Sequence, residues 1–174
     1  LATGGVTVNG YGVGPTLRDG VSAAGSDDSA IAKAAAFNAV SGQTGVTAKA
    51  NATTLTGGAI TAATNLAGGT GSSLYINNVK VGAIAAGAAG DKVSQGSNVA
   101  AAINAVSNQS GVTATFDKTS GAVSLAAADG RNIVVAETIT EGGGATLAGT
   151  GIAAAQEGTL RGTVTLSAAQ NITL

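Results

Sequence analysis

One block of this sequence occurs twice, almost without change. Residues 38–48 read NAVSGQTGVTA and residues 104–114 read NAVSNQSGVTA, so the copies differ only at Gly42/Asn108 and Thr44/Ser110. Upstream of each copy lies a second matched pair, VNGYGVG at 8–14 and INNVKVG at 76–82. A repeat of this length is a supersecondary module rather than a short solenoid unit. The sequence therefore predicts two small modules in tandem.

Each module is expected to open with a β-hairpin. Residues 5–8 alternate apolar and polar side chains before Asn9-Gly10, a pair that tolerates the positive φ angles of a tight type I′ turn. The second module has Asn77-Asn78 at the matching place. Asparagine is the residue type that follows glycine in its tolerance of left-handed backbone, so the same turn is predicted there.

A helix is predicted after each hairpin. Ser29 is expected to cap a helix over 30–40, and Ser97 a helix over 98–106. Val99, Ile103 and Val106 recur at the spacing of one helix face and should lie on a sheet, whereas Lys33 interrupts the matching stripe of Lys33, Phe37 and Val40. Asn38 and Asn104 are expected to bond to nearby backbone rather than to a ligand.

Strands and turns follow each helix. Gly45 and Gly111 suit a left-handed helix stop. Strands are predicted at 46–50, 112–116, 122–126 and 133–135, with turns at 117–121 and 129–132, weak strand signals at 53–65, and a closing strand pair at 159–166 and 171–174. The predicted fold is α+β: two tandem β-β-α-β-β modules, each a small sheet with one packed helix, closed by C-terminal strands. The expected ranges are 1–70, 71–137 and a Gly-rich connection with closing strands at 138–174.

Composition excludes several function classes. Charged residues make up 10% of the chain and nearly cancel, at a formal net charge of −1. Duplex nucleic acid requires clustered Lys and Arg, so we expect no nucleic-acid partner. The longest apolar stretch, 83–89, is far below the roughly 20 residues that a membrane helix needs, so we expect no membrane span.

Catalytic residue types are scarce. The absence of His and Cys removes Ser-His and Cys-His nucleophiles and the usual zinc ligand sets, leaving a carboxylate-based hydrolase as the one enzyme class still open. Asp27-Asp28 is the only adjacent acidic pair, and its position before a helix is explained by the helix dipole. Residues 117–121 lack the alternating oxygen ligands of a calcium loop and are expected to form a hairpin turn. We predict no catalytic, cofactor or metal site, and no enzyme.

The order of these segments resembles the module named for its Ile-Asn pairs, which occurs in the variable outer region of bacterial flagellins and in some hook-associated and filament-cap proteins. Ile76-Asn77-Asn78, Ile103-Asn104-Ala105 and the run 110–114 carry the resemblance, and the first copy departs from it with Phe37-Asn38. The segments DGRNI at 129–133 and LRGTVTLS at 160–167 are also similar to flagellins.

The resemblance implies a structural, surface-exposed outer domain of a flagellar filament subunit, located outside the cell on the bacterial flagellum. It implies other filament subunits as partners, through polymerisation segments that this fragment lacks, and glycan modification on Ser or Thr. The fragment alone is expected to be monomeric, with no cofactor. As an outer domain inserted in a subunit, it should have 5–8 and 171–174 close together.

Two alternatives remain open at this point. The chain could be a domain of a hook-associated or filament-cap protein, which share the module. It could instead be an adhesive or carbohydrate-binding surface module, for which Tyr11 and Tyr75 are the available aromatic side chains beside the two turns. Sugar recognition usually uses aromatic platforms, so the scarcity of aromatic residues disfavours this alternative.

Overall fold

The computed structural model describes residues 1–2, 5–60, 72–85, 87–88, 90–139, 149–152 and 158–174. Much of the Gly-rich connection, including the glycines at 142–144, and the end of the weak strand signals at 53–65 lie outside these ranges. The chain divides into two compact units. Unit 1 comprises Leu1–Thr53, Ala128–Asn132 and Arg161–Leu174, and unit 2 comprises Thr54–Ala127 and Ile133–Leu160.

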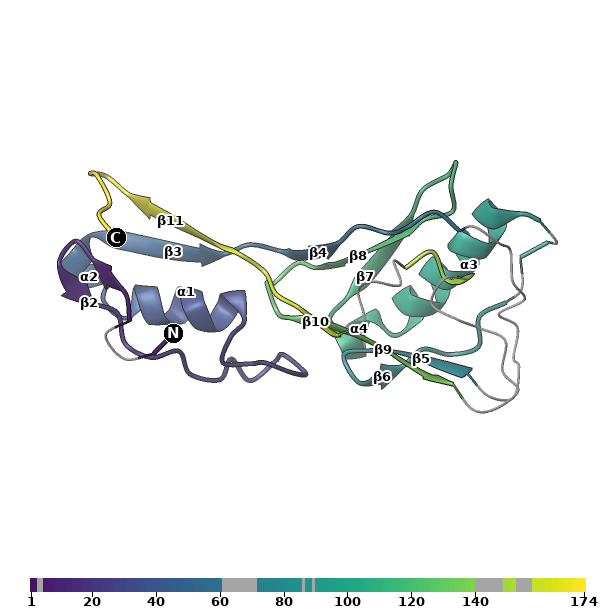
Figure 1. The fold of residues 1–174 in the computed structure, drawn as a ribbon, viewed down its shortest axis with the longest axis horizontal. Helices are drawn as coiled ribbons and strands as arrows, with labels where there is room; N and C mark the ends of the chain where they lie inside the picture. The colour runs from purple at the N-terminus through teal and green to yellow at the C-terminus, as the bar shows by residue number, and fades with distance from the viewer. Residues whose placement is uncertain (3–4, 61–71, 86, 89, 140–148, 153–157) are drawn as a thin grey trace. The chain divides into compact units, whose positions relative to one another are not determined.

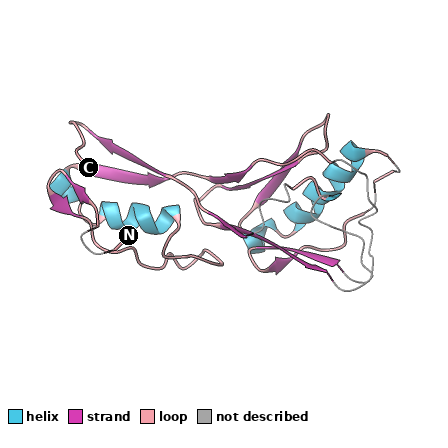
Figure 2. Ribbon diagram, viewed as in Figure 1, coloured by secondary structure: helices cyan, strands magenta, loops and turns pink. Residues whose placement is uncertain are grey.

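The fold is mixed α+β, with helices and several small antiparallel sheets (Figures 1 and 2). The α+β class predicted from the sequence is confirmed. The described elements, in chain order, are β1 (Thr7–Val8), β2 (Tyr11–Gly12), α1 (Ala30–Asn38), α2 (Ser41–Thr44), β3 (Val46–Ala50), β4 (Thr53–Leu55), β5 (Ser72–Ile76), β6 (Val79–Lys80), α3 (Lys92–Ala105), α4 (Ser107–Ser110), β7 (Thr113–Phe116), β8 (Val123–Ala127), β9 (Ile133–Ile139), β10 (Gly158–Leu160) and β11 (Val164–Ala168).

Both predicted hairpins are present. β1 pairs with β2 across Asn9 and Gly10, whose φ angles are 49° and 83°. β5 pairs with β6 across Asn77 and Asn78, at 51° and 64°. The left-handed backbone at both central residues is what a type I′ turn requires, and it explains why Asn and Gly occupy these positions.

The first helix begins where the sequence predicts, and the second begins earlier. Ser29 caps α1, its hydroxyl accepting from the backbone N–H of Ala32 at 3.0 Å. The prediction that Ser97 caps the second helix is wrong, because α3 begins at Lys92 and Asp91 caps it through the backbone N–H of Ser94 at 3.0 Å. Aspartate competes with serine for the cap, and the helix tolerates Gly96 in its second turn.

Each long helix packs on the strand that follows it, as predicted. In unit 1, α1 lies against β3 and its antiparallel partner β11 (Figure 1). In unit 2, α3 lies against β7 and β8. Gly45 and Gly111 are left-handed, at φ 68° and 71°, but they end the extra short helices α2 and α4 rather than the long ones.

The stripe on α3 is buried and the stripe on α1 is only partly so. Val99 and Ile103 are completely buried and Val106 partly. The buried side chains of α1 are Ala30, Ala32, Ala34 and Ala36, while Phe37 and Val40 are partly buried against the core.

The predicted closing strand pair is wrong. β10 pairs with β9 in unit 2, whereas β11 pairs with β3 in unit 1, in the register Val164↔Ala50 to Ala168↔Val46. Residues 171–174 form no strand, but they lie beside the first hairpin, where Asn9 donates its backbone N–H to the carbonyl of Thr173 at 2.9 Å. The expectation that 171–174 lies close to the first strand is confirmed.

Unit 2 adds strands to the pattern of unit 1. Its sheets have the orders β4-β8-β7 and β10-β9-β5-β6, while β3 and β11 form a two-stranded sheet in unit 1. Its core is correspondingly larger and includes Ile76, Ile103, Leu125 and Ile133, each at most 1% exposed. No helix in the described part of the chain is long and apolar enough to cross a membrane.

Candidate functional site

Of the adjacent acidic pair considered from the sequence, Asp28 is held in structural contacts. Asp28 forms ion pairs with Lys33, at 2.7 Å, and with Arg161. Asp27 is exposed just before α1. Within the described ranges no three His, Cys, Asp or Glu side chains gather as a metal site would require. Asp28 is therefore engaged by two cations, an arrangement suited to tying α1 to the segment before β11.

Asp117 organises a hairpin turn, as predicted. Its Oδ1 accepts from the backbone N–H groups of Thr119 and Ser120 and from the Ser120 hydroxyl, at 2.7–3.0 Å. These hydrogen bonds, with that from the Ser120 N–H the largest, hold the pKa of Asp117 below its ordinary value. Asp129 likewise pairs with Arg131 at 2.7 Å across the 129–132 turn.

The repeated asparagines near the helix ends each make a two-point contact with a strand. Asn38 donates from Nδ2 to the carbonyl of Ala48 and accepts from its N–H, at 2.9 and 2.7 Å. Asn104 makes the same two contacts with Ala114, at 2.9 and 2.8 Å. Their expected role in bonding backbone is confirmed, and the duplicated block 38–48 is explained, because it contains both partners of this contact.

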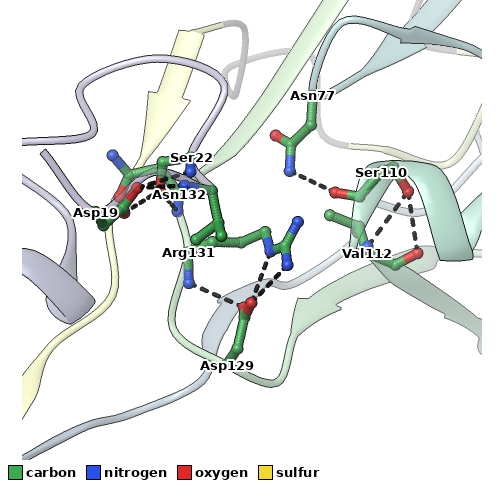
Figure 3. A network of polar contacts seen from close by, with 9 residues as sticks. Asp19, Ser22, Asn77, Ser110, Val112, Asp129, Arg131 and Asn132 are labelled. Carbon is green, nitrogen blue, oxygen red and sulfur yellow. Dashed lines mark hydrogen bonds and ion pairs between the residues drawn. The ribbon is translucent and has the colours of Figure 1, made fainter.

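The asparagines of the two turns form a second matched pair. Asn9 donates from Nδ2 to the Thr44 carbonyl at 2.8 Å, and its Oδ1 accepts from the N–H of Thr173 at 2.9 Å. Asn77 donates to the Ser110 carbonyl at 2.9 Å (Figure 3) and accepts from the N–H of Val134 at 2.7 Å. Each turn asparagine thus joins a helix end to a later segment, 171–174 in unit 1 and β9 in unit 2.

Thr173 and Val134 occupy equivalent positions, because each donates its N–H to a turn asparagine. The equivalence extends to the strands before them. β11 pairs with β3 in unit 1 as β8 pairs with β7 in unit 2. The cores correspond residue by residue, in the pairs Val6/Leu74, Val8/Ile76, Val13/Val81, Ala36/Ala102, Phe37/Ile103, Val40/Val106, Val46/Val112, Leu166/Leu125 and Ile172/Ile133.

Reasoning from the sequence missed this third repeated block, although a signal for it exists. Residues 162–168 read GTVTLSA and residues 121–127 read GAVSLAA; NIT at 171–173 then matches NIV at 132–134. The spacing between these copies differs from that of the earlier blocks. Their chain order is also reversed, because the unit 2 copy precedes the unit 1 copy, whereas in the earlier blocks the unit 1 copy comes first. A search at one fixed offset cannot find it.

Asn132 anchors the segment 128–132 within unit 1 (Figure 3). It is completely buried, accepts no hydrogen bond at Oδ1, and donates from Nδ2 to the carbonyls of Ala24 and Gly25 at 3.0 and 2.8 Å. Its backbone N–H donates to the Ser22 hydroxyl at 2.9 Å, and that hydroxyl donates to Asp19 at 2.6 Å. Burial opposes ionisation of Asp19, but the hydrogen bonds from Ser22, Ser29 and Val21 together outweigh it and lower its pKa.

Two shallow grooves lie on the helices. One, of about 370 Å³, runs between α3 and β7 and includes Ala100, Asn104 and Phe116. The other, of about 310 Å³, lies on α1 beside Leu17 and Ile31. Neither brings together a nucleophile, a base and an oxyanion donor, which an acyl-transfer site needs.

The two tyrosines do not occupy matching positions. Tyr11 follows its turn, on β2, and pairs with Val8; Tyr75 precedes its turn, on β5, and pairs with Lys80. Tyr11 is half exposed. Their cross-strand pairing accounts for both rings as packing residues of the hairpins.

Comparison with known proteins adds no assignment: no protein-family model matches the chain, and a search of curated proteins found no significant match.

We expect Asn104→Ala to lower the free energy of unfolding by about 1–3 kcal/mol, because two hydrogen bonds of about 0.5–1.5 kcal/mol each are lost. Asn104→Asp should cost a comparable amount, since a carboxylate accepts from the Ala114 N–H but cannot donate to its carbonyl. Urea unfolding measures both effects. Asn108→Ala, at an exposed residue of α4, is the control and should change stability by less than about 0.5 kcal/mol.

Stability should also fall in acid. The hydrogen bond from Lys33 is the largest cause of the lowered pKa of Asp28, and the charges of Lys33 and Arg161 add to it. A carboxyl group whose pKa is lower in the folded state contributes stability above its unfolded pKa, and this is lost as pH falls from about 5 through the folded pKa. In thermal unfolding, Asp28→Asn should reduce the loss of stability between neutral and acid pH, and Lys33→Gln should reduce it too. A loss of stability in acid that is unchanged in both variants would contradict the role given to the ion pair.

Proposed function

We propose that this chain forms surface-exposed outer domains of a bacterial flagellar filament subunit, with a structural role outside the cell. It has no enzymatic activity and needs no cofactor. Its filament partners are other subunits, which it meets through segments that are not in this sequence. The exposed Ser and Thr residues are open to glycan modification.

The matched contacts of the four asparagines are the main support for this proposal. They favour two copies of one β-β-α-β-β module, each a small sheet with a packed helix, and it is this module that resembles flagellin outer regions. Asn77 and Asn104, the asparagines of the two Ile-Asn pairs, carry structural hydrogen bonds in unit 2. Asn38 carries the same contact in unit 1 although Phe37 replaces the isoleucine.

The position of 171–174 gives further support. Where a domain is inserted in a filament subunit, the chain leaves the stem at the start of the domain and returns to it at the end. The first and last segments of the domain therefore need to lie together. Here Asn9 and Thr173 are joined by two hydrogen bonds of 2.9 Å. This arrangement suits an outer domain carried by a polymerising stem.

Immunogold electron microscopy of the source bacterium tests the proposal. Antibodies raised against the chain should label flagella along their whole length. Labelling confined to the filament tip would identify a cap protein, and labelling at the hook junction a hook-associated protein. Labelling of the cell body with bare flagella would overturn the proposal and favour an adhesive module.

The chain alone should sediment as a monomer at micromolar concentration. The large hydrophobic side chains that are exposed in the described part of the chain are Tyr11, Leu17, Val21 and Leu174. These four side chains are too few for the contiguous apolar patch of several hundred Å² that marks a stable interface. Analytical ultracentrifugation measures this; a stable oligomer or spontaneous fibres would place assembly contacts in this region.

A further inference from the structure

The point where the chain leaves unit 1 corresponds to a hairpin turn in unit 2. In unit 2 the N–H of Asp117 donates to the Ala122 carbonyl at 2.8 Å, which closes the β7–β8 ladder around a short turn. In unit 1 the N–H of Asn51 donates to the Thr163 carbonyl at 2.9 Å, closing the β3–β11 ladder in the same way. Between Asp117 and Ala122 lie four residues, whereas between Asn51 and Thr163 lies the whole of unit 2, together with segment 128–132 of unit 1.

We propose that unit 2 is a second copy of the unit 1 module, inserted into the turn of the β3–β11 hairpin, and that the turn 117–121 is the equivalent insertion site of unit 2. The chain is then nested rather than tandem. A further folded domain can be inserted in the 117–121 turn while unit 2 keeps its fold. This inference does not depend on the proposed function, because it concerns only how the chain folds.

Unit 1 shows that the ladder closes without a short turn. In unit 2 the turn is held by Asp117, whose Oδ1 accepts from Thr119 and Ser120. In unit 1 the side chain of Asn51 stands in that place and bonds across the ladder instead, from Nδ2 to the hydroxyls of Thr163 and Thr165 at 3.0 and 2.9 Å. The closing pair of unit 1 therefore forms without a short turn between its members.

The contacts of the turn locate the insertion point. Asp117, Lys118 and Thr119 are exposed. Gly121 is buried and has a φ of 73°, and a Cβ there would collide with the Lys92 carbonyl. Gly162, its counterpart, would place a Cβ 3.0 Å from the Asn51 carbonyl. Both glycines belong to the closely packed part of the turn next to the strands. The insertion point is therefore placed away from them, between Lys118 and Thr119.

The test uses the full chain with about twenty Gly and Ser residues inserted between Lys118 and Thr119. Lengthening a loop costs little chain entropy, so the melting temperature should stay within about 5 °C of the parent. The amides of Ala114 and Val134, bound by Asn104 and Asn77, should keep their protection from hydrogen exchange. The control places the same segment between Asn77 and Asn78, where the turn asparagine is 8% exposed and doubly bonded. It should remove the protection of Val134.

A second variant carries residues 52–161 of the chain itself between Lys118 and Thr119. It has two copies of Ala114 and of Val134, and the amides of both copies should be protected. Loss of protection at Ala114 or Val134 in the Gly-Ser variant, as large as the loss at Val134 in the control insertion, would overturn the proposal. Equal tolerance at both turns would also overturn it, because the duplication would then single out no site. If the Gly-Ser segment is tolerated but the second variant loses amide protection in unit 2, the turn is rejected as a site for inserted domains.

Discussion

Replacing Ile103 by alanine should lower the free energy of unfolding of unit 2 by about 2–5 kcal/mol. Its side chain is completely buried on α3 and packs in the core that includes Ile76, Leu125 and Ile133. Truncation removes three methyl or methylene groups and leaves a cavity, and the two costs add.

Chemical denaturation followed by circular dichroism measures the effect of Ile103→Ala. Leu17→Ala is the control, because Leu17 is 76% exposed and its truncation should change stability by less than about 0.5 kcal/mol. A loss below about 1 kcal/mol for Ile103→Ala would mean that α3 does not pack on its sheet through this face.

Gly96→Ala should destabilise unit 2 by about 1–3 kcal/mol, although alanine is the better helix former by about 1 kcal/mol. A Cβ at Gly96, inside α3, would collide with the carbonyl of Gly121, in the turn that precedes the strand β8. The helix and the turn would have to move apart. The same two residues explain why α3 crosses the hairpin so closely.

Gly42→Ala is the matched control for Gly96→Ala. Gly42 lies in the short helix α2, has open space where a Cβ would stand, and has no left-handed φ. Alanine there should leave stability unchanged or raise it. Thermal unfolding of the two variants compares them, and a stabilised Gly96→Ala variant would refute the close approach of α3 to Gly121.

Local signals predicted the elements but not which strands pair. Asn9-Gly10 and Asn77-Asn78 mark turns because left-handed backbone has a short list of suitable residues, and Ser29 marks a helix start for a similarly local reason. Asp91 was missed as a cap because the second turn of its helix contains Gly96, which lowers helix propensity. The tight packing of α3 on Gly121, a contact between distant residues, favours that glycine.

Strand pairing depends on contacts between residues far apart in the sequence, so periodicity alone could not assign β11. Its partner β3 lies more than a hundred residues earlier, and pairing it with 171–174 followed only from their proximity in the chain. The buried contacts of Asn132 with Ala24 and Gly25 could not be predicted for the same reason. The roles of Asn38 and Asn104 could be predicted because their partners lie ten residues away.

Amide hydrogen exchange at Thr173 and Val134 tests most directly that segment 171–174 completes unit 1 as β9 completes unit 2. In the parent chain both amides donate to a turn asparagine and should be protected. Asn9→Ala should accelerate exchange at Thr173 and leave Val134 protected, and Asn77→Ala should do the reverse. Free exchange at Thr173 in the parent chain, or a Thr173 amide that does not respond to Asn9→Ala, would contradict the account.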